Sequence, residues 1–492
     1  MKTERTISFL QLMTYTGLAA GLLVLTYLIL NAKLPVSLVF AAVPFGILVV
    51  MLLLRYPYLA LLSLFVLNYF IIAIARYAIA GLKAGVVIDG MIAVVIVGLL
   101  IFSFKNRLPW QNLRNGLTLA VSLWFFYCLF HILNPLGPFE TWLIGIRRTA
   151  LYFFAFPVLT FLLFNRYKDF KIIIIIWSVC VLLAVLKALM QKYLGFDTAE
   201  MKFLYLEGKA RTHIIYSGIR YFSFFTDAAN FGCAMAFAMV FFSISALFIE
   251  NRILQTYFVT VSVFAGLGML MSGTRVAIAI PFTGYALFAV LSRNYKIITG
   301  GAVLLLTTYI FLSFTNIGQG NSYIRRMRTA FHPQKDASFV VRMENQERMK
   351  AYLADKPFGV GLGTSKASGM EDELSKIPTD SWLVMIWVET GIVGLILYLC
   401  LILFIFAKGI YIILFKIKNK ELWGLECALL SGMSGMFVAS YANEVIAQFP
   451  NGPIIYTAMA FVFMAERFER DIINGKKDKL TEHGGNTRNI DY

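Results

Sequence analysis

The sequence has few charged residues. Only 14% of its 492 residues are Asp, Glu, Lys or Arg, whereas 59% are hydrophobic. A soluble domain carries about 25% charged residues, so this deficit excludes a water-soluble surface over most of the chain. Apolar runs of the roughly 20 residues that cross a bilayer recur from end to end, and they leave no room for a large soluble domain.

The sequence also lacks the spacings of disulfide and metal sites. Its five cysteines lie far apart inside apolar runs, which favours small buried hydrophobic residues over disulfides or zinc ligands. They are Cys128, Cys180, Cys233, Cys400 and Cys427. No two of the four histidines have metal-ligand spacing, and the acidic run at 371–373 is most simply a solvated loop. We therefore expect neither a metal nor a cofactor.

The apolar runs predict an all-α, polytopic membrane bundle of about 14 helices. The first run is too long for the core of a signal peptide and has no clear cleavage site, so we expect it to be retained. We place the helices at 7–30, 36–54, 58–75, 86–104, 117–133, 149–164, 172–190, 228–249, 254–271, 276–292, 297–314, 382–407, 423–445 and 453–468.

Lysine and arginine predict the orientation of these helices. The formal net charge is +17, and most of the positive residues lie between apolar runs, where Lys and Arg hold short loops in the cytoplasm. With the N-terminus inside, nearly every short basic loop and the C-terminal tail fall on the cytoplasmic side. Both termini are therefore expected in the cytoplasm. Because no basic region forms a folded module, we expect no nucleic-acid partner.

Two connections on the outer side are long, 191–227 and 315–381. The second contains residues 340–353, whose apolar residues have helical spacing with charges between them, which predicts an amphipathic helix near the outer membrane surface. The predicted parts are an N-terminal bundle (1–190), an outer loop (191–227), central helices (228–314), a large outer loop (315–381), C-terminal helices (382–468) and a cytoplasmic tail (469–492).

Three arginines near the outer boundary are candidates for binding an anion. Arg275 lies between two predicted helices, where an arginine costs energy unless it snorkels or finds an anion. Guanidinium groups bind phosphate oxygens in pairs. Arg220, just before a helix, could join the same site, and so could Arg342 on the amphipathic segment. The alternatives are a snorkelling anchor, a surface arginine, and a solvated face shared with Glu344 and Arg348.

A proton acceptor could come from a carboxylate or a histidine. Asp380 precedes a helix near these arginines, where it could act as a general base or merely cap the helix. Glu389 is expected inside the bilayer, where carboxylates are functional candidates, although it could also simply pair with a basic group. His213 and His332, in the long outer loops, are further candidates, whereas His131 ends an apolar helix and is expected to be structural.

The segment Gly359-Val360-Gly361-Leu362-Gly363 looks superficially like a nucleotide-binding loop. It follows no predicted strand and lacks the lysine of a phosphate loop. We expect instead a tight re-entrant turn in which glycine lets the backbone approach another group closely.

The order of these motifs resembles the O-antigen ligase and Wzy-type O-antigen and exopolysaccharide polymerase family of bacterial envelopes. The resemblance covers about 260–400; upstream, only Gly145-Ile146-Arg147-Arg148 and the Arg220 segment are similar. The motifs are Ser272-Gly273-Thr274-Arg275, Arg342, Lys356-Pro357-Phe358-Gly359-Val360-Gly361-Leu362-Gly363, and Asp380-Ser381-Trp382-Leu383 followed by Glu389-Thr390-Gly391-Ile392-Val393-Gly394.

The resemblance implies a GT-C-like glycosyltransferase of the bacterial inner (cytoplasmic) membrane, with its active site facing the periplasm or cell exterior. Such enzymes move a saccharide from undecaprenyl diphosphate to an acceptor glycan, which is lipid A core for ligases and a lipid-linked repeat unit for polymerases. Arg275 and Arg342 would hold the donor diphosphate, with Arg148 a further candidate. Ligases have histidine and asparagine where this chain has Asp380 and Ser381, which favours a polymerase. The partners are then these glycans and membrane lipids.

Two other functions are possible. A flippase or transporter for lipid-linked saccharides would also have many helices and basic cavities, but it does not need the long outer loop, and no two-fold repeat is detected. A transferase using a monosaccharide phosphate carrier would have a paired acidic motif in the first outer loop, which is absent. The sequence therefore favours a metal-independent polymerase, with a flippase as the alternative.

Overall fold

The computed structural model describes residues 34–78, 81–215, 218–331, 337–366, 379 and 381–485. Eleven of the described helices are long and apolar enough to cross a membrane, judged by length and composition. This confirms the predicted all-α polytopic membrane protein. The predicted spans 36–54 and 453–468 are also helical, whereas the predicted helix 7–30 lies outside the described residues, as do Asp380 and His332.

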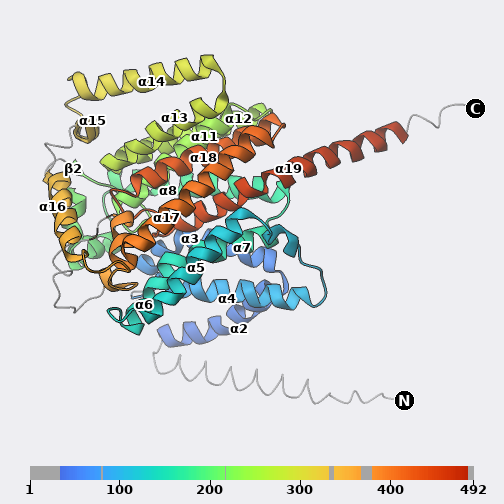
Figure 1. Ribbon diagram of the computed structural model, residues 1–492, viewed down its shortest axis with the longest axis horizontal. Coiled ribbons are helices and arrows are strands. Elements are labelled where there is room, and N and C mark those ends of the chain that lie inside the picture. Colours follow the sequence, from blue (N-terminus) through green and yellow to red (C-terminus); the bar gives the residue numbers. More distant parts are fainter. Residues whose placement is uncertain are drawn as a thin grey trace, which may run out of the picture. The chain divides into compact units, whose positions relative to one another are not determined.

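The helices follow one another with few long connections (Figure 1). Their bounds are α2 Leu34–Arg55, α3 Pro57–Tyr77, α4 Ala84–Ser103, α5 Gly116–Phe130, α6 Phe139–Ile146, α7 Tyr152–Leu163, α8 Tyr167–Tyr193, α9 Thr198–Met201, α10 Ala210–His213, α11 Ala228–Ala246, α12 Arg252–Met271, α13 Ala279–Ser292, α14 Tyr295–Phe314, α15 Ser322–Arg328, α16 Ala337–Tyr352, α17 Trp382–Phe415, α18 Lys420–Ala439 and α19 Asn451–Gly485. Short 3-10 or π-helical turns are η1 Trp110–Leu113, η2 His131–Leu133, η3 Arg147–Leu151, η4 Lys202–Leu206, η5 Arg275–Ile278, η6 Thr329–Phe331 and η8 Thr364–Lys366.

The chain divides into two compact units. One comprises Met1–Ala60 with Gly90–Arg107, and the other comprises Leu61–Asp89 with Leu108–Tyr492. Every candidate site residue that the structure describes belongs to the second unit, which also holds the strands β1 (Ile214–Ile215) and β2 (Gly218–Ile219), a short antiparallel pair.

The core of the second unit forms around α11, which packs against α12, α13 and α18 (Figure 1). Small residues allow these helices to approach closely. A Cβ on Gly284 of α13 would lie 2.9 Å from Val240 Cγ1 and 3.1 Å from the Ser431 carbonyl, and one on Gly435 of α18 would lie 2.6 Å from Ile280 Cα. Membrane helices associate largely through such close packing, so these glycines fix the scaffold beneath the site.

The backbone of residues 356–363 inserts into a break in α17. Gly391 has a φ of +70° inside this helix, and a Cβ on Gly359 would meet the backbone of Gly391. Three hydrogen bonds join the segments: Val360 N to Val388 O at 3.0 Å, Gly361 N to Glu389 O at 3.1 Å, and Val393 N to Pro357 O at 3.2 Å. The predicted re-entrant glycine turn is thus confirmed, and it satisfies backbone groups that the break exposes.

The structure corrects two details of the sequence prediction. The helix predicted at 423–445 ends at Ala439, because the Ser440 carbonyl accepts a hydrogen bond from the Trp382 amide at 3.0 Å instead of continuing the helix. Cys400 is exposed on the outside of α17, so the prediction of five buried cysteines holds only for the other four.

Candidate functional site

A pocket of roughly 720 Å³ opens at the end of the bundle where α11 and α19 begin and α12 and α18 end. Arg220, Arg275 and Arg342 all line it, so the structure brings together the three arginines that the sequence placed in one anion site. The lining holds six cationic side chains and two carboxylates, Asp227 and Glu444. This excess of positive charge favours an anionic ligand.

The Ser272–Arg275 turn is tied to the start of α11. Thr274 donates its hydroxyl hydrogen to the Ala228 carbonyl at 2.9 Å, and its amide donates to Ser272 Oγ at 3.1 Å. Gly232 of α11 has no room for a Cβ, which would clash with the Ser272 side chain. These contacts fix the turn and place Arg275 at the pocket wall, at the first position of η5.

Arg220 braces this turn. Its Nη1 donates to the Thr212 carbonyl at 2.9 Å and its Nη2 to Thr274 Oγ1 at 3.0 Å. Burial lowers the pKa of Arg220; Asp227 raises this pKa, and the charge of Arg275 lowers it. Since both terminal nitrogens already donate hydrogen bonds to protein oxygens, the main role of Arg220 is to hold the Ser272–Arg275 turn in place and not to bind the ligand.

Arg326 is a pocket residue that sequence reasoning missed. It lies on α15, and a Cβ on Gly273 would sit 3.1 Å from Arg326 Cδ and 3.5 Å from Arg220 Cγ. Gly273 has a φ of +57°, so glycine serves both the turn and the close approach of two arginines. The available signal was the cluster of arginines at 325–328 in the large outer loop.

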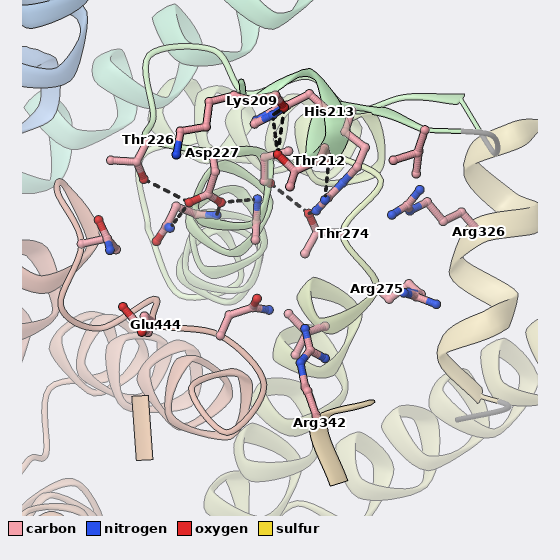
Figure 2. Close-up of a pocket in the computed structure, with 18 of the residues that line it drawn as sticks. Lys209, Thr212, His213, Thr226, Asp227, Thr274, Arg275, Arg326, Arg342 and Glu444 are labelled. Atoms are coloured by element: carbon pink, nitrogen blue, oxygen red, sulfur yellow. Dashed lines mark hydrogen bonds between the residues drawn. The ribbon is translucent and has the colours of Figure 1, made fainter. Parts of the chain in front are cut away.

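Arg342 reaches the pocket from α16, the amphipathic helix predicted from the sequence. Its Nε is buried and has no hydrogen-bond partner in the described part of the chain. Its neighbours Glu344 and Arg348, also candidates from sequence, are exposed and do not line the pocket. Met349 anchors the helix through a buried cluster with Val360 and Val388. In Figure 2, Arg342 lies below the cavity, whereas Arg275 and Arg326 lie to its right.

Glu389 is fully buried and pairs with Arg148. Arg148 Nη2 donates to Glu389 Oε1 at 2.7 Å, and the Ser365 hydroxyl donates to the same oxygen. Neither Glu389 nor Arg148 lines the pocket. The structure thus supports the alternative in which Glu389 is a buried partner for a basic group. The contacts among Arg148, Glu389 and Ser365 connect η3, α17 and η8.

Lys366, the residue after Ser365, lines the pocket and forms an ion pair with Glu444 at 2.7 Å. Glu444 lies between α18 and α19, and its side chain is only 10% exposed. Burial raises the pKa of Glu444, while Lys366 and Arg148 lower it and Glu389 raises it. Sequence reasoning missed this carboxylate because it fell inside the predicted helix 423–445.

His213 lines the same pocket, but its ring is held in place. Nδ1 lies 2.9 Å from the Lys209 carbonyl, and the ring packs edge-on against Phe203 and Phe222. Burial lowers the pKa of His213, and so does the charge of Arg220, whereas its hydrogen bond to Lys209 raises it. These contacts favour a structural role for His213, although it lines the cavity.

Comparison with known proteins agrees with the motif order. Residues 260–399 match the O-antigen ligase family. No curated protein matches the chain. The matched segment contains Arg275, Arg326, Arg342 and Lys366, so much of the pocket's cationic lining comes from it. Through this segment, the chain is similar to the O-antigen ligase family.

Proposed function

We propose that the protein is a glycosyltransferase of the bacterial cytoplasmic membrane. It transfers a saccharide from undecaprenyl diphosphate to an acceptor glycan at the outer face. The observation that carries the proposal is the cationic pocket, whose arginines come from the family-matched segment and from the loop before α11. On the predicted topology, this end of the bundle faces the cell exterior or periplasm.

Arg275 and Arg342, with Arg326 beside them, bind the donor diphosphate. When the bond between the anomeric carbon and the phosphate oxygen breaks, negative charge develops on the leaving diphosphate. Guanidinium groups fixed in advance stabilise that charge without a metal ion. Removing one such donor typically costs about 10²–10³ in rate.

The acceptor hydroxyl must lose its proton as it attacks. Asp380, predicted from sequence, is one candidate acceptor for this proton, at the residue before the Ser381 cap of α17. A positioned base contributes about 10²–10⁴ in rate.

The acceptor favoured here is a second lipid-linked repeat unit, so the reaction is polymerisation. The support is the Asp380-Ser381 pair, which stands where ligases of the family have histidine and asparagine. Carrier-linked glycans isolated from a deletion strain test the assignment. Single repeat units accumulating on the outer leaflet fit a polymerase. Finished chains there would indicate a ligase, and an inward-facing pool would indicate the flippase alternative.

The first prediction concerns purified protein in proteoliposomes supplied with lipid-linked repeat units. Arg275→Ala should lower chain extension about 100-fold or more, because it removes charge stabilisation from the leaving group. Arg275→Lys should also be poor, since lysine cannot make paired contacts. The wild-type rate should persist in EDTA. Full activity of Arg275→Ala, or a strict need for a divalent cation, would contradict the arginine-based mechanism.

A further inference from the structure

The pocket lining also contains a carboxylate, Glu444, which lies away from Arg275 and Arg326. In Figure 2, Glu444 lies at the left of the cavity that it lines, Arg275 and Arg326 lie at the right, and Arg342 lies below. The other carboxylate of the lining, Asp227, is occupied: it caps α11 by accepting the amides of Ala229 and Asn230 at 2.7 and 2.9 Å. Among the described lining residues, Glu444 is therefore the carboxylate that can act on a ligand.

The segment that carries Glu444 is fixed at both ends. On one side, the Ser440 carbonyl accepts the Trp382 amide at 3.0 Å, which ties the segment to the start of α17. On the other, Asn451 Nδ2 donates to the Asn230 carbonyl at 3.2 Å, which ties it to the start of α11. Glu444 is thus held in place relative to the arginines by the same helix ends that form the pocket.

The Lys366 contact leaves Glu444 able to accept a proton. Glu444 Oε1 lies 2.7 Å from Lys366 Nζ in an ion pair, and Oε2 is not part of this contact. Burial raises the pKa of the carboxyl, Lys366 and Arg148 lower it, and Glu389 raises it. Arg275, Arg342, Asp227 and Lys209 also line this cavity. A carboxylate whose pKa is raised by burial is a stronger base than one held ionised by arginines alone.

We infer that Glu444 is the catalytic base of the transfer. The acceptor sugar hydroxyl gives its proton to Glu444 as its oxygen bonds to the anomeric carbon of the donor. The bond from that carbon to the phosphate oxygen breaks, and its electron pair leaves with the lipid diphosphate held by the arginines. Glu444 later returns the proton to water. This inference rests on the proposed function and assigns the base to Glu444 in place of Asp380.

The test compares Glu444→Gln with Asp380→Asn and with Glu347→Gln, a matched control on the exposed face of α16. The assay is chain extension in proteoliposomes, with binding of undecaprenyl diphosphate measured on the same samples. Glu444→Gln should lower the rate about 100-fold or more with donor binding unchanged, Glu444→Asp should recover part of it, and Glu347→Gln should stay within a few-fold of wild type. Near-normal turnover of Glu444→Gln, or a 100-fold loss in Asp380→Asn alone, would overturn the inference.

A second measurement guards against a merely structural effect. The base must be ionised, so kcat/KM should fall as pH drops through the pKa of Glu444. Lys366→Met removes a charge that lowers the pKa of Glu444, so the acidic limb of the pH profile should move to higher pH. An acidic limb that stays in place in Lys366→Met would assign the base elsewhere. Loss of activity in Arg275→Ala together with normal Glu444→Gln would leave the proposed function standing and remove only this inference.

Discussion

Single residues of the pocket differ in role even where their chemistry is the same. The sequence makes Arg342 a ligand of the donor diphosphate and Arg220 a residue that could join the same site. The structure separates them, because Arg220 donates to Thr212 and Thr274 whereas Arg342 has a buried Nε with no hydrogen-bond partner in the described chain. Hydrogen bonds inside the protein leave fewer donors for a ligand, so a guanidinium's role depends on its partners and not on its position in the motif.

Gly273 gives a prediction at this scale. Alanine there would hold an unfavourable φ of +57° and press on Arg326 and Arg220, so Gly273→Ala should destabilise the protein by more than about 1 kcal/mol. Gly300 in α14, whose Cβ position is open, is the matched control and should gain about 0.5–1 kcal/mol. Thermal unfolding in detergent measures both. Equal stability of the two variants would contradict the role given to Gly273.

The sequence predicted candidate residues that can be recognised within their own segment. It missed residues that reach the site only through contacts distant in the chain. Arg275 stands at a helix boundary and Arg342 on an amphipathic stripe, so each was visible in its own segment. Glu444 was hidden because α18 ends through a hydrogen bond from Trp382, far away in the chain. Lys366 acquires its role from a different distant contact, its ion pair with Glu444. No local pattern encodes either contact.

Among the elements, α17 is broken at a point where another part of the family-matched segment, residues 356–363, packs against it. The fold at this break depends on backbone contacts between residues 356–363 and the helix, and on the buried pair of Arg148 and Glu389. The sequence predicted the glycine turn, since clustered glycines permit close approach. It could not predict that the turn fills a gap in α17, because the sequence around Gly391 has the pattern of a continuous apolar helix.

The buried pair gives a prediction at the scale of elements. Arg148→Ala should destabilise the protein by about 3–5 kcal/mol, because it leaves the Glu389 carboxylate buried without its partner. Arg147→Ala is the matched control: its ion pair with Asp89 is 3.0 Å long with both side chains 29% exposed, so the loss should be about 1 kcal/mol or less. Double replacement of Arg148 and Glu389 by Met and Leu should recover much of the loss. A similar stability for the two single variants would refute the assigned role of the pair.

At the scale of the whole molecule, the arrangement of basic loops predicts which end of the bundle faces outward. If the N-terminus is cytoplasmic, nearly all short basic loops are predicted on the side opposite the two long loops 191–227 and 315–381. The all-α membrane architecture is confirmed, and the orientation stays a prediction.

Labelling of single cysteines tests this orientation. In a variant without the five native cysteines, Lys335→Cys should react with an impermeant maleimide in intact spheroplasts, because 315–381 is predicted outside. Lys418→Cys should react only after lysis. Protection at 335 together with labelling at 418 would reverse the topology and move the pocket to the cytoplasmic side.

The central claim is that the arginine pocket binds the diphosphate of the donor. Its most direct measurement is the affinity of the purified protein for undecaprenyl diphosphate, compared among wild type, Arg342→Ala and Arg348→Ala. Hydrogen bonds to a charged group contribute about 1.5–3 kcal/mol, so Arg342→Ala should weaken binding roughly 10- to 100-fold. Arg348→Ala, on the same helix but outside the pocket, should bind like wild type. Unchanged affinity in Arg342→Ala, or an equal loss in both variants, would contradict the account.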